Sequence, residues 1–204
     1  MYVNQESSTM QRGGGLQVGT KIMVDFPAFI TRDSETKHIL VGDESFALVP
    51  NGIIAETYSR LLESSGYDEV GKIMYESARK VAYEGQKHLI QAFNITLKTR
   101  QDFVAKLSEL LFYISTFGYG IGEGEEQEEE FVFRIRHSFV AEYLKGKALK
   151  KPVCLFLAGI LAGGAQAYAE LLEAPSSYSC VETKCIAIGD PYCEFHLAAS
   201  KSAT

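Results

Sequence analysis

Hydrophobic residues recur every three or four positions through the middle of the chain, which predicts three helices. The first follows Pro50 and ends at Ser64-Ser65-Gly66. The second spans residues 68–93, and the third begins near Thr99. The spacing places one apolar stripe of the second helix and one of the third toward the core: Val70, Ile73, Met74, Ala78, Val81 and Ala82, then Phe103, Leu107, Leu110, Leu111 and Ile114.

The period changes to two at Gly118. Glycine alternates with larger residues over 118–124, which indicates a strand with one glycine face, and a turn region follows at 125–130. Phe131, Phe133 and Ile135 form the apolar face of a second strand. A short helix is predicted at 138–144, a Gly/Ala-rich helix at 152–173, and two final strands at 178–188 and 192–198. The fold class is therefore α+β, with an antiparallel sheet of about four strands packed against several helices. The helices come first and a C-terminal β-hairpin comes last.

The domain organisation is simple, since 204 residues suit one compact domain. We expect a flexible tail at 1–20, an N-terminal extension at 21–49 with a hairpin around Gly42-Asp43, the main domain at 50–198, and a tail at 199–204.

Composition and charge narrow the function. A net charge of −6 lacks the basic excess typical of nucleic-acid binders. The polar N-terminus has no apolar core of a secretory signal, so we expect a cytoplasmic protein. Residues 152–169 carry no charge, but they begin with proline and contain three glycines, which favours a buried core helix over a membrane span.

Signatures of catalysis are missing from the sequence. The glycine run at 118–124 has neither the order nor the Lys-Ser/Thr of a phosphate loop, and six glutamates at 123–130 would repel a phosphate. No two of the histidines lie four positions apart, and no serine lies in a nucleophile elbow: His38, His88, His137, His196. We therefore predict no catalytic residue and find no positive evidence for an enzyme.

The cysteines near the C-terminus carry the clearest chemical signal. If the last hairpin turns at Gly189, residues whose numbers add to 378 lie opposite each other, and Cys185 and Cys193 form such a pair. Their Cβ atoms would lie about 5 Å apart, which suits a disulfide or a shared metal. A reducing compartment favours a metal, and soft ligands favour zinc; buried, unpaired thiols are the alternative.

The chain resembles the 4-vinyl reductase (4VR) domain family. The resemblance is strongest over residues 118–198, in Pro152-Val153-Cys154, Glu182-x-x-Cys185 and Gly189-Asp190-x-x-Cys193-x-Phe195. In phenol-sensing bacterial regulators of that family, three cysteines and a glutamate hold zinc, which implies Cys154, Glu182, Cys185 and Cys193 here and leaves Cys180 over. Glu182 and Cys185 lie three apart, so a regular strand would point them to opposite faces, and a bulge or a late strand start is required.

The resemblance also implies a small-molecule function. Members of the family sit in aromatic-compound sensors, in bacteriochlorophyll synthesis and, more distantly, in vesicle-tethering complexes. It implies a ligand-binding or sensory module for a small hydrophobic or aromatic molecule, with a structural zinc site, a homodimer and a separate output protein. Candidate pocket residues are aromatic: Phe112, Tyr119, Phe131, Phe133, Phe156 and Tyr168.

Two other functions stay open at this point. A reductase of a vinyl-substituted ring would need a separate redox partner, because the sequence has no flavin or nicotinamide fingerprint. A dimerising scaffold of the tethering type would use the small residues Gly159, Gly163 and Gly164, which permit close helix packing within the monomer or across a dimer.

Overall fold

The computed structural model describes residues 30–36, 38–41, 44–46, 49–127, 130–173 and 177–200. The expected tail at 1–20 and residues 201–204 of the expected C-terminal tail lie outside these residues. The described helices are α2 (Asn51–Ser65), α3 (Tyr67–Ala92), α4 (Arg100–Thr116), α5 (Phe139–Leu144) and α6 (Leu155–Glu170). The strands are β1 (Ile30–Arg32), β2 (Ile39–Val41), β3 (Glu44–Phe46), β4 (Ile121–Gln127), β5 (Glu130–Arg136), β6 (Ser177–Lys184) and β7 (Cys193–Ser200).

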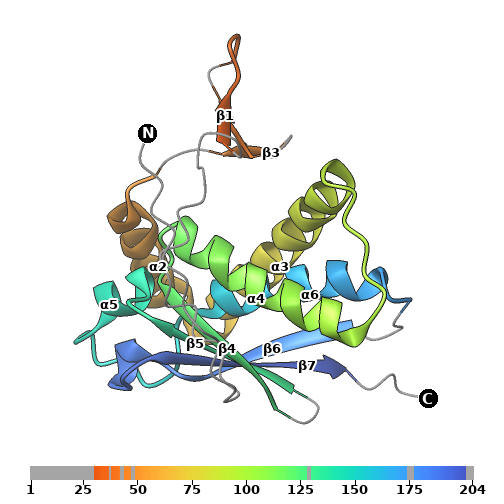
Figure 1. Ribbon diagram of the computed structural model, residues 1–204. Coiled ribbons are helices and arrows are strands. Elements are labelled where there is room, and N and C mark those ends of the chain that lie inside the picture. Colours follow the sequence, from red (N-terminus) through yellow and green to blue (C-terminus); the bar gives the residue numbers. More distant parts are fainter. Residues whose placement is uncertain are drawn as a thin grey trace, which may run out of the picture.

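Strands β4 to β7 form one antiparallel sheet in the order β4-β5-β7-β6, and the helices cover one of its faces (Figure 1). The α+β class, the helices-first order and the C-terminal hairpin are therefore confirmed. A separate three-stranded sheet, β1-β2-β3, lies beyond the helices, and its β2–β3 pair is the hairpin expected in the N-terminal extension (Figure 1).

The helix-covered face of the sheet is apolar because β5 and β7 alternate in phase. Phe133 pairs with Phe195 and Ile135 with Cys193, and all four residues are buried. The alternation places Arg134 opposite Glu194, where the two side chains form an ion pair at 2.9 Å. A one-residue slip would exchange these faces, so the pattern fixes the register.

The Gly/Ala-rich helix α6 is buried along most of its length and packs closely on α3. A Cβ atom added to Gly159 would lie 2.4 Å from the carbonyl oxygen of Tyr75, and one added to Gly163 would lie 2.2 Å from that of Arg79. Only glycine allows so close an approach of two helix backbones. Both glycines therefore serve packing within the monomer. Among the described residues, no helix is long and apolar enough to cross a membrane.

Several predicted boundaries and faces differ from the structure. The strand predicted at 118–124 begins only at Ile121, since Gly118 and Gly120 adopt positive φ and form a turn. The strand predicted at 178–188 ends at Lys184 and is followed by a short 3-10 helix. All five predicted core residues of α4 are buried, but Ile73 and Val81 of α3 are 55% and 66% exposed, because the neighbouring helices cover only part of its wide apolar stripe.

Candidate metal site and apolar cavity

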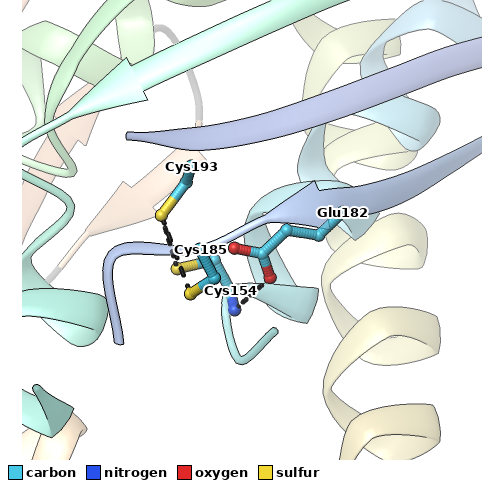
Figure 2. A group of neighbouring side chains, drawn as sticks. All are labelled: Cys154, Glu182, Cys185 and Cys193. Atoms are coloured by element: carbon cyan, nitrogen blue, oxygen red, sulfur yellow. Dashed lines mark hydrogen bonds between the residues drawn. The ribbon is translucent and has the colours of Figure 1, made fainter. Parts of the chain in front are cut away.

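Three separate segments bring Cys154, Glu182, Cys185 and Cys193 together. Cys154 immediately precedes α6, Glu182 lies on β6, Cys185 follows β6, and Cys193 begins β7. All four are buried, and one ligand atom from each lies within 4.8 Å of the others. Figure 2 shows the three sulfur atoms and the carboxylate turned toward one another.

Two local features allow this convergence. The β6–β7 ladder shifts register between Glu182 and Lys184, which confirms the irregularity that the spacing of Glu182 and Cys185 requires. The turn that follows is held by Asp190, whose carboxylate accepts a hydrogen bond of 2.8 Å from the backbone N–H of Cys185. Gly189 supplies the positive φ of 106° at that turn. The Gly-Asp pair thus shapes the loop that carries both thiols.

The sulfur spacing fits a tetrahedral metal. The Sγ of Cys193 lies 3.7 Å from that of Cys154 and 3.8 Å from that of Cys185. In a tetrahedral site with metal–sulfur bonds of about 2.3 Å, neighbouring sulfurs lie about 3.8 Å apart. A disulfide would need about 2.05 Å, and all four cysteines are free.

Glu182 presents one unsatisfied oxygen to the cluster. Its Oε2 accepts a hydrogen bond of 2.6 Å from the backbone N–H of Cys154 (Figure 2). Its Oε1 is one of two fully buried side-chain polar atoms without a hydrogen-bond partner among the described residues. A buried oxygen without a partner is costly, and a metal ion is one partner that would satisfy it. Three thiols and this oxygen make four donors, so the residues fit zinc.

The cluster is electrostatically tense without a cation. Burial, together with the neighbouring Cys185, raises the pKa of Glu182 to about 9. Burial likewise raises the pKa of the Cys154 thiol. Hydrogen bonds from the thiols of Cys154 and Cys193 lower the pKa of Cys185. A divalent cation would favour the ionised form of all four groups.

Two neighbours complete the surroundings of the cluster. The buried Ser138 hydroxyl lies 3.1 Å from the Sγ of Cys154, a contact that no motif in the sequence indicates. The Tyr67 hydroxyl donates to the carbonyl of Pro152 and so anchors the segment before Cys154 to α3. Cys180, left over in the sequence, is buried on β6 opposite Leu197 and is not part of the group.

An open cavity of about 530 Å³ lies between α3, α4 and α6. Its wall is mostly aliphatic and aromatic, with Met74 and Val81 from α3, Leu110 from α4, and Ile160 from α6. Ser45 of β3 also contributes, so the small N-terminal sheet reaches the cavity.

The predicted pocket residues divide into two groups. Tyr119 and Phe156 line the cavity and pack edge to face, with ring centroids 5.6 Å apart. Phe131, Phe133 and Tyr168 are buried in the core and are not in the cavity wall. Phe112, half-buried on α4, does not line it either.

Sequence reasoning passed over Gln86, which lines the cavity and is buried. The sequence does hold a signal for it: Gln86 lies four and eight residues after Ala82 and Ala78, on the same side of α3.

Comparison with known proteins supplies the family. Residues 131–199 match the model of the vinyl-4-reductase (4VR) domain family. The resemblance seen in the sequence is thereby confirmed, and the matched segment contains Cys154, Glu182, Cys185 and Cys193. A search of curated protein sequences finds no match.

Solved structures share the fold at low sequence identity. The phenol-responsive sensory domain of the transcription activator PoxR, solved with phenol, has a TM-score of 0.68 and 12% identity, and the match covers 84% of this chain and 85% of that one. A trafficking protein particle complex subunit 3 from Naegleria fowleri, covalently bound to palmitic acid, has a TM-score of 0.54 and 12% identity over 74% of this chain and 95% of that one. A vinyl-4-reductase family protein from Methanocaldococcus jannaschii matches with a TM-score of 0.46 and 16% identity over 76% of this chain and 85% of that one. The likeness to the first two structures thus extends well beyond the segment that matches in sequence.

Proposed function

We propose that this protein is a ligand-binding or sensory module for a small hydrophobic or aromatic molecule. The observation that carries the proposal is the cavity between α3, α4 and α6. Its volume of about 530 Å³ falls within the range of about 300–1,000 Å³ that small-molecule sites occupy. The likeness of the fold to a phenol-responsive sensory domain supports the same function.

A panel of neutral apolar and aromatic compounds tests this function. We expect several to raise the unfolding temperature, because a ligand that binds only the folded state stabilises it. Native mass spectrometry should show one bound molecule per chain. Val81→Trp, at the exposed end of the cavity wall, should fill part of the space and weaken binding, whereas Val181→Trp, on an exposed strand position outside the cavity wall, should not. A panel without a single binder would refute the function.

We further propose that Cys154, Glu182, Cys185 and Cys193 hold a structural zinc ion. Such an ion would join the start of α6 to the β6–β7 turn and supply stability through its four bonds. The residues themselves form a closed set with no open position in the donor count, which favours a structural over a catalytic site.

Metal analysis of matched variants tests the zinc site. The wild-type protein should carry one zinc per chain and lose thermal stability with a strong chelator. Cys193→Ser should lose the zinc, whereas Cys180→Ser, a buried thiol outside the group, should keep it. Zinc-free wild-type protein that is unaffected by zinc or chelator would support the alternative of buried free thiols.

The module would act in the cytoplasm as a homodimer and pass its signal to a separate protein. Light scattering with and without an apolar ligand measures the oligomeric state. A monomer under both conditions would contradict the homodimer without affecting the cavity.

A further inference from the structure

The cavity wall contains no charged side chain. No Asp, Glu, Lys, Arg or His is among the described residues that line it. Burying an ion without a partner is strongly unfavourable, so a charged group would not enter the inner part of this space. The ligand that the wall suits is therefore neutral.

Size sets a second limit. A cavity of about 150 Å³ is enough for benzene. The cavity here, at about 530 Å³, is more than three times larger. A single unsubstituted ring would leave most of the apolar wall uncovered, so a ligand with a larger apolar body gains more from burial.

Gln86 is the polar residue that distinguishes the inner wall. It is 5% exposed and is the only buried polar residue in the cavity wall among the described residues. Ser77 is exposed, and Tyr113 and Tyr119 are half-buried, so water competes for their hydroxyls. A hydrogen bond to Gln86 would meet less such competition.

One end of the Gln86 amide is already used. Its Nε2 donates a hydrogen bond of 2.8 Å to the hydroxyl of the fully buried Tyr168, which holds the amide in place. Within the described residues, no group donates to its Oε1. This oxygen is not among the fully buried atoms that lack a partner, so a molecule in the adjoining space can reach it. Gln86 therefore offers a fixed, unsatisfied acceptor to whatever occupies the cavity.

We propose that Gln86 is the specificity-determining residue of the cavity and that its Oε1 accepts a hydrogen bond from a neutral ligand with a hydroxyl or N–H group on an apolar body larger than one ring. This inference rests on the proposed ligand-binding function. Tyr168 acts as a positioning residue, since it orients the amide and does not line the cavity itself.

Two naphthalenes of similar size and shape test the proposal. 2-Naphthol can donate a hydrogen bond, and 2-methoxynaphthalene cannot. Isothermal titration calorimetry on the full chain should show that the naphthol binds about tenfold more tightly, the effect of one buried hydrogen bond. 2-Naphthoate, which is charged, should bind more weakly than either.

Variants assign the preference to Gln86. Gln86→Leu should weaken naphthol binding to the level of the methoxy compound and leave binding of the methoxy compound unchanged. Because that change leaves the Tyr168 hydroxyl unpaired, the double variant Gln86→Leu/Tyr168→Phe removes both partners and should give the same result in a more stable protein. Ser77→Ala, in the exposed part of the wall, should keep the preference.

The outcomes separate this inference from the function beneath it. Equal binding of the two neutral compounds by the wild-type protein, or a preference that survives in both Gln86 variants, overturns the role of Gln86 and leaves the ligand-binding function intact. Failure of both naphthalenes to bind also overturns the inference. The function falls with it only if the wider apolar panel fails as well.

Discussion

Replacing Gly163 with alanine tests the contact that sets the spacing of α3 and α6. The added Cβ would lie 2.2 Å from the carbonyl oxygen of Arg79 and 2.9 Å from the backbone nitrogen of Tyr83. Ordinary contact begins at 3.4 Å, so the helices must part by about 1 Å. The obstacle is backbone, which cannot rotate away as a side chain would.

The cost follows from the packing that is lost. A gap of about 0.5–1 Å forfeits roughly a quarter to a half of each dispersion contact, and overpacked cores lose about 1–3 kcal/mol, occasionally more. Alanine returns about 1 kcal/mol of helix propensity. We expect a net loss of about 2 kcal/mol, which corresponds to a fall in Tm of about 4–8 °C for a chain of this size.

Gly85→Ala on α3 is the matched control. No atom lies within 4 Å of a Cβ built there, so the same chemical change should stabilise the protein by about 0.5–1 kcal/mol. Thermal and urea unfolding followed by circular dichroism measure both variants. Equal shifts of the same sign in the two variants would show that α3 and α6 do not meet at Gly163.

Three further changes probe other parts of the molecule. Tyr58→Phe should leave stability unchanged or raise it by about 1 kcal/mol in urea unfolding, because the buried Tyr58 hydroxyl has no partner among the described residues; a loss would reveal a partner. Glu194→Gln should cost roughly 1–3 kcal/mol at pH 7 through lost bonds to Lys184 and Arg134. Although burial opposes ionisation of Glu194, those two cations lower its pKa from 4.5 to about 2, so the difference from wild type should be full above pH 4.5 and vanish as the pH falls toward 2; a difference that grows in acid would contradict this sign. Thr99→Ala should cost about 1 kcal/mol, since it removes the side-chain half of the capping box of α4, and an unchanged urea midpoint would show that the cap contributes nothing.

Local periodicity was enough to predict most of the helices and strands. The three central helices, the sheet strands and the final hairpin appear where spacing of three to four or of two indicates them, because each period reports which face of an element is buried. The boundaries moved where backbone geometry intervened. Gly118 and Gly120 alternate like strand residues but turn the chain instead.

The metal site was predictable for a similar reason. Cys185 and Cys193 are eight residues apart across one tight turn, so hairpin pairing alone brings them together. Cys154 and Glu182 were placed by family resemblance, since no local rule links a helix start to a strand twenty-eight residues later. Only the fold shows why they converge, through the bulge on β6 and the backbone hydrogen bond from Cys154 to Glu182.

The cavity was decided by tertiary structure alone. Aromatic residues such as Phe133 and Tyr168 have the composition of a pocket wall, yet they fill the core, whereas Gln86 has no such signature and lines the open space. A sequence records which faces avoid water, and any two such faces can pack against each other. Whether they meet without a gap depends on how closely the helices approach, which here is set by glycine contacts between α6 and α3. The sequence by itself thus determined the elements and the thiol pair, while the empty space and its polar acceptor depend on how the helices are packed in three dimensions.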